Sequence, residues 1–181
     1  MGEFKYAIRE ATADDAEKLL AYLQQVGGES DGLTFDAEGL PITVEQERQY
    51  LDMRICSANN ITLLALEGER IIGSLGVDTP SIERFSHRGE MGISVLKECW
   101  GQGVGSALLE AMLSWIRDFP TGLRKIDLTV REDNRRAIAL YKKFGFKQEG
   151  TIARFVLIDN TFYDGITMGL LLDCKGRSSN A

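Results

Sequence analysis

Residues 90–109 read EMGISVLKECWGQGVGSALL, a strand-like stretch followed by a glycine-rich turn and the start of a helix. The helix, residues 103–119, carries apolar side chains at the helical period, as a helix with one buried face does. Gly101, Gly103 and Gly105 lie between the two elements, where bare backbone can approach an anion and the helix N-terminus offers free N–H groups. This arrangement predicts a turn that binds a diphosphate.

The spacing of the turn leaves three interpretations open. The pattern GxGxG differs from the GxGxxG fingerprint of dinucleotide-binding folds, and the Lys-Ser/Thr pair of a P-loop is missing. The glycines therefore suit a different diphosphate ligand, a nucleotide-binding protein without either fingerprint, or a tight strand-to-helix turn that binds nothing. A second motif is needed to decide among them.

On both sides of the turn, alternating and helical apolar patterns divide the chain into further elements. Strands are predicted at 6–9, 61–66, 71–78, 90–96, 125–130, 146–157 and 162–172, and helices at 12–27, 43–57, 103–119 and 134–144. This order predicts an α/β fold, a mixed sheet with helices on its faces, in one domain over residues 1–174. Residues 175–181 are expected to form a polar tail.

Local signals set several element boundaries. Thr43 and Gln46 have the spacing of a capping box at a helix start. Gly27 and Gly28 are expected to end the first helix, because glycine weakens a helical pattern. Residues 67–70 and 159–160 are typical of hairpin turns, so the strands that flank each of them should pair.

The composition is that of a soluble globular domain with an acidic surface. The 181 residues are 44% hydrophobic and 27% charged, with a net charge of −6. So acidic a chain lacks the basic surface that nucleic acid requires, and it suits a cationic substrate. Three cysteines without a CxxC pair favour reduced thiols over a disulfide framework or a zinc site. Without a signal peptide or a run of about 20 apolar residues, we expect a cytoplasmic protein with no membrane partner.

A second block of sequence gives the glycine turn its context. After the turn come Asn134, Ala137, Leu140, Tyr141 and then Gly145-Phe146. Together with residues 95–109, this block resembles the paired central motifs of the GNAT acetyltransferase superfamily, and residues 6–16 resemble its first strand and helix. The resemblance implies a single-domain GNAT fold, with a mixed, mostly antiparallel sheet in which one strand pair splays apart. It also implies acetyl-CoA as the cosubstrate and no metal.

In this family the pantetheine arm lies between the splayed strands, and the glycine turn holds the diphosphate. The resemblance implies that backbone N–H of Ser94 or Val95 polarises the thioester carbonyl. The residues implied to bind the cofactor are Ile93, Ser94, Val95, Gly101, Gln102, Gly103, Val104, Gly105, Ser106, Asn134 and Tyr141.

Tyr141 resembles the family tyrosine that protonates the departing coenzyme A thiolate, and Asn134 the residue that hydrogen-bonds the pantetheine arm. The two are seven residues apart, about two helical turns, so they share one helix face. A phenol with a reference pKa of about 10 is protonated at neutral pH and can act as an acid. The alternatives are a helix-capping asparagine and a half-buried core tyrosine.

The acceptor amine needs a group that takes a proton, because an alkylammonium with a pKa of about 10.4 is charged at neutral pH. Glu90 resembles in position a catalytic glutamate of the histone-acetylating branch. Strand periodicity places it on the same face as Gly92 and Ser94. A solvent-facing strand-end glutamate is the alternative. A second branch has its glutamate five residues before the motif asparagine, and Thr129 stands there in this chain.

Other side chains are weaker candidates. The family commonly has Arg or Gln where Trp100 stands, so Trp100 either packs under the turn or contacts the cofactor. His87 is a candidate base or a plain loop residue. Cys99 lacks a recognisable histidine partner for covalent catalysis. The remaining polar and aromatic candidates either line an amine pocket or belong to solvated loops. They are Glu29, Ser30, Asp31, Phe35, Asp36, Tyr163 and Asp164.

These observations predict an N-acetyltransferase that joins acetyl-CoA and a primary amine in a ternary complex, with direct attack of the amine and no acyl-enzyme. The alternative is a non-catalytic acyl-CoA sensor or interaction module on the same fold. The acceptor is an amine-bearing small molecule or protein. A homodimer is left open beside a monomer.

Overall fold

The computed structural model describes residues 5–29, 32–33, 37–119 and 121–172. Four α-helices lie in this part of the chain: α1 (Ala16–Glu29), α2 (Val44–Ile55), α3 (Val104–Asp118) and α4 (Arg135–Lys143). The strands are β1 (Ala7–Glu10), β2 (Ile61–Glu67), β3 (Arg70–Asp78), β4 (Arg88–Val95), β5 (Lys125–Arg131), β6 (Lys147–Ile158) and β7 (Thr161–Leu171). The predicted tail, residues 175–181, lies outside the described residues.

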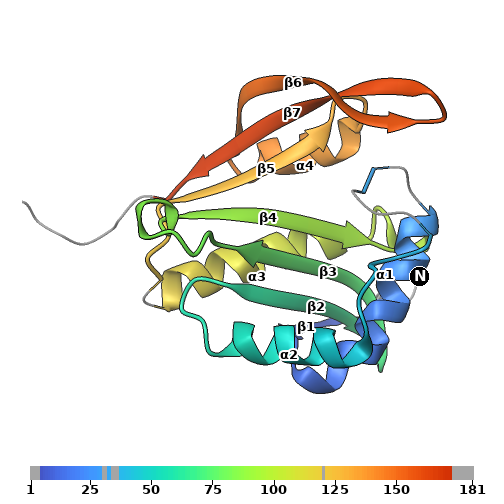
Figure 1. The fold of residues 1–181 in the computed structure, drawn as a ribbon, viewed down its shortest axis with the longest axis vertical. Coiled ribbons are helices and arrows are strands. Elements are labelled where there is room, and N and C mark those ends of the chain that lie inside the picture. Colours follow the sequence, from blue (N-terminus) through green and yellow to red (C-terminus); the bar gives the residue numbers. More distant parts are fainter. Residues whose placement is uncertain (1–4, 30–31, 34–36, 120, 173–181) are drawn as a thin grey trace, which may run out of the picture.

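The strands form one sheet in the order β1-β2-β3-β4-β5-β7-β6 (Figure 1). Neighbouring strands are antiparallel except for β4 and β5, which run parallel. The helix α3 supplies the crossover that a parallel pair requires. The expectation of a mixed, mostly antiparallel sheet is confirmed.

The parallel pair is joined only at its beginning. The register of β4 and β5 runs from Arg88 opposite Lys125 to Glu90 opposite Asp127, and then the pairing stops. Both strands continue, to Val95 and to Arg131, so their later halves separate as Figure 1 shows. The predicted splayed pair is confirmed, and it leaves two strand edges whose backbone groups are unpaired within the sheet.

Helices cover both faces of the β1–β4 half of the sheet. A Cβ added at Gly73 of β3 would lie 3.1 Å from Leu108 and Val104 of α3, and one added at Gly76 would lie 3.5 Å from Arg54 of α2. Positions 73 and 76 point to opposite sides of a strand, so α3 and α2 lie on opposite faces. The strand β2 between them is buried from Ile61 to Leu66, as a strand covered on both faces should be.

The end of the first helix differs from the prediction. The helix α1 continues through Gly27 and Gly28 to Glu29 instead of stopping at the glycines. A Cβ at Gly28 would lie 3.3 Å from Ala37, so the glycine lets the following segment pack closely. A carboxylate oxygen of Glu29 also accepts the backbone N–H of Lys97 at 2.7 Å, which fixes the helix end. Tertiary contacts therefore outweigh the low helix propensity of glycine.

The other local signals are confirmed. Thr43 and Gln46 form the capping box of α2, with the N–H of Gln46 donating to Thr43 Oγ1. The turn between β6 and β7 has φ of 47° at Asp159 and 59° at Asn160, the left-handed backbone of a tight hairpin. None of the helices in the described ranges is long and apolar enough to cross a membrane.

Asp15, just before α1, makes the stability of the fold depend on pH. Its carboxylate, 6% exposed, accepts two hydrogen bonds from Arg9 at 2.7 Å each and one from Thr12 N–H at 2.8 Å. The hydrogen bonds from Arg9, helped by Thr12, lower the pKa of Asp15 to about 2. The ionised carboxylate therefore stabilises the fold above the unfolded pKa of about 3.9, and this contribution disappears as pH falls through about 2.

We expect Asp15→Asn to lower the free energy of unfolding by about 2 kcal/mol at pH 7. The difference from wild type should shrink as pH falls from about 4 to about 2, because wild type then loses the same charge. Urea unfolding at a series of pH values measures both quantities. A difference that does not change with pH would contradict this account of Asp15.

Candidate active site

A cleft of about 1120 Å³ opens where β4 and β5 separate. It extends from the glycine turn at the start of α3, past α4, to the side of the sheet that carries α1. Of the predicted cofactor residues, the cleft is lined by Ile93, Ser94, Val95, Gly101, Gly103, Val104, Gly105, Ser106, Asn134 and Tyr141. Gln102 is the member of that set that does not line it, because its side-chain amide donates to Glu98 O at 2.9 Å.

The glycine turn presents bare backbone to this cleft. Gly101 and Gly103 have φ of 79° and 86°, and no atom lies within 4 Å of a Cβ added at Gly101. The first backbone N–H bonded along α3 is that of Ala107, which donates to Gly103 O at 3.0 Å. The N–H groups of the residues between them, Val104 to Ser106, are therefore left without a helical acceptor at the positive end of α3. This is the geometry of an anion site.

The edge of β4 offers further backbone groups. Leu96 donates its N–H to Ile72 O of β3 at 3.0 Å. Because neighbouring residues of a strand turn their backbone groups to opposite edges, those of Val95 and Ile93 point into the gap between β4 and β5. The carbonyl oxygen of Val95 already accepts the indole N–H of Trp100 at 2.7 Å. The backbone group of Val95 that remains available to a ligand is therefore its N–H.

The N-terminus of α4 lies on the opposite side of the cleft. Asn134 caps this helix, its Oδ1 accepting the N–H of Ala137 at 3.1 Å. The cap therefore uses the carbonyl oxygen of the side chain, and the amide NH₂ remains a donor for a ligand. Capping and ligand binding, the two interpretations of Asn134, are compatible.

Tyr141, two turns along α4, is buried at 7% exposure, and its ring packs 5.9 Å from that of Phe146. Burial raises the pKa of Tyr141 to about 12. Within the described ranges no side chain or backbone group hydrogen-bonds its hydroxyl, although the residue lines the cleft. Tyr141 is thus a protonated donor whose partner must come from the cleft.

Two carboxylates stand on the face of the sheet that carries α1 and α2. Asp78 of β3 lies directly opposite Glu90 of β4 in the ladder, and both line the cleft. Asp78 Oδ1 accepts hydrogen bonds from Tyr50, at 2.8 Å, and from the buried Arg54. Glu90 is exposed. On the same face the hydroxyls of Tyr22 and Ser94 lie 2.9 Å apart, and no atom lies within 4 Å of a Cβ added at Gly92.

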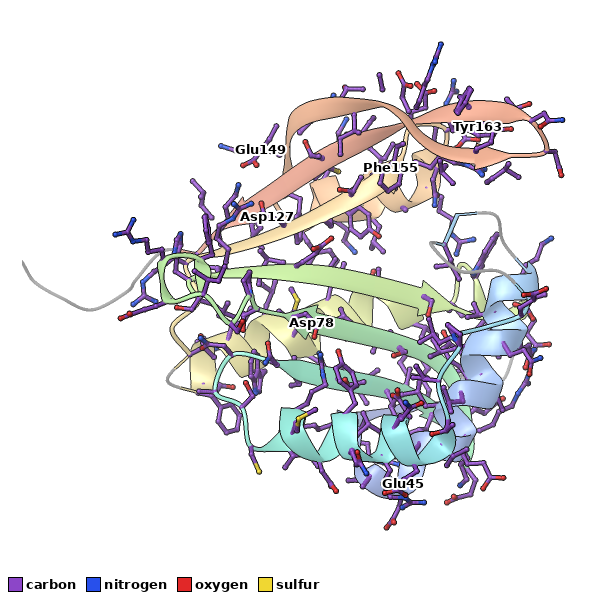
Figure 2. The ribbon with its side chains drawn as sticks, viewed as in Figure 1. Glu45, Asp78, Asp127, Glu149, Phe155 and Tyr163 are labelled. Carbon is purple, nitrogen blue, oxygen red and sulfur yellow. The ribbon has the colours of Figure 1, made fainter. Side chains whose placement is uncertain are left out.

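A bulge in β6 aims one aromatic side chain into the cleft. Ile152 pairs with Gly165, and Val156 pairs with Tyr163. Between these two pairs β6 therefore contains two more residues than β7. Phe155 lies in the bulge and lines the cleft, and a Cβ at Gly165 would lie 2.6 Å from its ring. Figure 2 shows Phe155 beneath the β6–β7 hairpin, across from the part of the sheet that carries Asp78.

Several weaker candidates lie elsewhere. His87 and the hairpin residues Tyr163 and Asp164 do not line the cleft, and Glu29 is engaged by Lys97 N–H. Cys99 lines the cleft but is a buried thiol whose pKa is raised, chiefly by desolvation, which disfavours a thiolate nucleophile. The remaining early-loop candidates, Ser30, Asp31, Phe35 and Asp36, lie outside the described residues.

The sequence patterns missed Asp78, Phe155 and Arg136, which line the cleft, and Tyr22, whose hydroxyl contacts that of the lining residue Ser94. Arg136 lies in the first turn of α4, so its nearness in sequence to Asn134 is the one signal that could have drawn attention to it. Asp78 and Tyr22 depend on strand register and helix packing, and Phe155 depends on the bulge. No local sequence signal identifies these three.

The chain is similar in sequence to known acetyltransferases. The model of the Acetyltransferase (GNAT) family matches residues 33–146. The L-amino acid N-acetyltransferase AaaT of Escherichia coli (strain K12) is 35% identical over 102 residues, which are 54% of this chain. The match spans 60% of the length of that relative.

Two solved structures share the fold. The GNAT-family acetyltransferase of Streptococcus pneumoniae superimposes with a TM-score of 0.89 at 36% identity, over 93% of this chain and 100% of that one. The yncA protein of Salmonella typhimurium, solved with its cofactor acetyl-CoA, has a TM-score of 0.80 at 18% identity, over 97% of this chain and 98% of its own.

Proposed function

The chain belongs to the acetyltransferase (GNAT) family, and on this basis we propose that it transfers an acetyl group from acetyl-CoA to a primary amine. The observation that carries the proposal is one cleft with an anion cradle at one end and, further in, the hydroxyl of Tyr141, which no other described residue hydrogen-bonds. A diphosphate with a thioester at the far end of a flexible arm is the ligand that such a cleft suits.

The residues of the cleft fit acetyl-CoA. The bare turn from Gly101 to Gly105 and the free N–H groups of α3 suit the diphosphate. The unpaired edge of β4 suits the amides of the pantetheine arm, much as a sheet edge accepts an added strand. The N–H of Val95, directed into the gap, suits the oxygen of the thioester carbonyl. The side-chain NH₂ of Asn134 is a donor for the same arm.

The acceptor amine would enter from the face that carries α1 and α2. Glu90 gives that face a negative charge that attracts an ammonium group, whereas the charge of Asp78 beside it is offset by the ion pair with Arg54. Leu23, Leu33 and Phe155 line the same cleft with apolar surface, which suits an amine attached to a hydrocarbon group. The name of the Escherichia coli relative makes L-amino acids the first acceptors to test.

We assign the transfer to direct attack within a ternary complex. The ammonium group gives one proton to Glu90 or to a water beside it, and the nitrogen of the neutral amine then forms a bond to the acetyl carbon. The bond from that carbon to sulfur breaks, and Tyr141 gives its hydroxyl proton to the departing thiolate. The second proton lost by nitrogen passes to solvent. Glu90 then releases its proton to solvent, and Tyr141 recovers its own from solvent. No covalent acyl-enzyme is needed.

The acidity of Tyr141 is adequate for this step only inside the cleft. A phenol with a pKa of about 12 is a weak acid toward an ordinary thiolate, whose conjugate thiol has a pKa of about 8.5. The burial that raises the pKa of Tyr141 acts also on a thiolate formed beside it, because desolvation disfavours any isolated charge. The pKa of Tyr141 and the pKa of the thiol are therefore raised together, which keeps proton transfer from Tyr141 to the thiolate feasible.

Glu90→Gln tests the proposed proton acceptor. We expect kcat/KM for the amine to fall about tenfold at pH 7, because the amide keeps the shape but cannot take a proton. The loss should shrink as pH approaches the pKa of an alkylamine, about 10.4, where the amine is already neutral. The affinity of the variant for acetyl-CoA, measured by titration, should equal that of wild type.

The control is Glu83→Gln, in the exposed turn Glu83–Phe85 outside the cleft, which should behave like wild type. A loss at Glu90 that is the same at every pH would remove Glu90 from the role of proton acceptor. Binding of acetyl-CoA without turnover on any amine would instead favour the acyl-CoA sensor.

A further inference from the structure

An arginine from α4 stands over the ring of Trp100, directly beside the glycine turn. The guanidinium carbon of Arg136 lies 4.7 Å from the ring centroid, within the range of a cation–π contact. Trp100 is fixed in turn by its indole N–H, which donates to Val95 O at 2.7 Å. Both side chains line the cleft. The pair therefore holds a positive charge at a defined place on the cleft wall.

This charge has no acidic partner in the described part of the chain. No ion pair among the described residues involves Arg136, and the nearest acidic residue in sequence, Asp133, is bound by Arg131 at 2.6 Å. Arg136 also occupies the first turn of α4, which contains no acidic residue. A cation there is opposed by the positive end of the helix dipole, so the position is unfavourable until an anion binds. In a chain of net charge −6, an unpaired arginine beside an anion cradle points to a ligand.

We propose that Arg136, held on the Trp100 ring, is a binding residue for the diphosphate of acetyl-CoA. This inference rests on the proposed use of acetyl-CoA as cosubstrate. Trp100 immediately precedes Gly101, so the stacked guanidinium faces the phosphates that the turn holds. A planar guanidinium can donate two hydrogen bonds to phosphate oxygens, whereas the backbone N–H groups of α3 donate one each. Trp100 thus acts as the platform that positions the charge.

The test is calorimetric titration of wild type and Arg136→Ala with three ligands. These are acetyl-CoA, its 3′-dephospho form, which keeps the diphosphate, and S-acetylpantetheine, which has no diphosphate. We expect Arg136→Ala to weaken the first two by the same factor, about tenfold, as for loss of a charge-assisted hydrogen bond. Affinity for S-acetylpantetheine should not change. Arg135→Ala is the matched control, because Arg135 is its neighbour on α4 but does not line the cleft; it should change affinity less than about twofold.

A second pair of variants tests the platform. With Trp100→Ala in place, Arg136→Ala should cost much less than it does in wild type, because the guanidinium is no longer held. Arg136 is exposed, so its variants should fold as wild type does. The inference is overturned if Arg136→Ala binds acetyl-CoA like wild type, if only the ligand with the 3′-phosphate is weakened, or if S-acetylpantetheine is weakened equally. Wild type that fails to bind acetyl-CoA would overturn the proposed function itself.

Discussion

Tyr141→Phe should lower kcat for acetyl transfer by about 100- to 1,000-fold, as expected for loss of a general acid. The affinity for acetyl-CoA should change less than about twofold, since no group among the described residues hydrogen-bonds the hydroxyl and the ring still packs on Phe146. Steady-state kinetics with a turned-over amine give kcat, and a titration gives the affinity. The expected result is thus a change in chemistry without a change in binding.

The matched control is Tyr163→Phe, which removes the hydroxyl of a tyrosine on the β6–β7 hairpin outside the cleft (Figure 2). It should leave kcat unaltered. Because burial raises the pKa of Tyr141 to about 12, its proton stays in place throughout the range in which an ordinary tyrosine, with a pKa of about 10, ionises. Wild-type kcat should therefore show no decline between about pH 9 and pH 11 that depends on Tyr141. A Tyr141→Phe variant that turns over at the wild-type rate would contradict its role.

Gly105→Val should reduce the affinity for acetyl-CoA by at least about 100-fold, because it fills the anion cradle. The backbone of Gly105 is helical and not left-handed, so valine fits its φ and is no worse a helix former than glycine. A Cβ there would lie 3.2 Å from Leu140, close to the cleft. The same Cβ would lie 4.0 Å from Ile93 and Val95, so the branched side chain would stand between α4 and β4 beside the turn and narrow the cleft where the diphosphate end of acetyl-CoA would lie.

The matched control is Glu110→Val, which places the same side chain at an exposed position of the same helix. Thermal unfolding should show that both variants fold, and titration should show that only Gly105→Val loses acetyl-CoA. Wild-type affinity in a folded Gly105→Val protein would mean that the turn does not hold the diphosphate.

Local sequence signals predicted most of the fold. The hairpin turn at 159–160 and the capping box of Thr43 depend only on residues within a few positions of each other, and both are confirmed. The splayed strand pair came from the resemblance, because no pattern within Glu90 to Val95 marks where its pairing with β5 ends. Local sequence patterns therefore predict those structures whose stabilising contacts lie within a few residues of one another.

The rest of the site depends on contacts between distant segments. The bulge that aims Phe155 into the cleft is seated on Gly165, on the next strand. Asp78 is held by Arg54 from another element. The end of α1 was predicted wrongly because its stabilising partner, the N–H of Lys97, is far away in sequence. In the sequence, Trp100 is only a departure from the family pattern. Its proposed role depends on the cation–π contact with Arg136, which the sequence does not indicate.

The central claim is that the cleft moves an acetyl group from acetyl-CoA to an amine. The most direct test incubates the protein with acetyl-CoA carrying a carbon-13 acetyl group and a panel of L-amino acids, polyamines, aminoglycosides and peptides. Thiol release and the mass of each amine are followed together. We predict that at least one amine gains the labelled acetyl group in step with the release of free coenzyme A. Saturable binding of acetyl-CoA, with no amine acetylated and no thiol released, would contradict the claim.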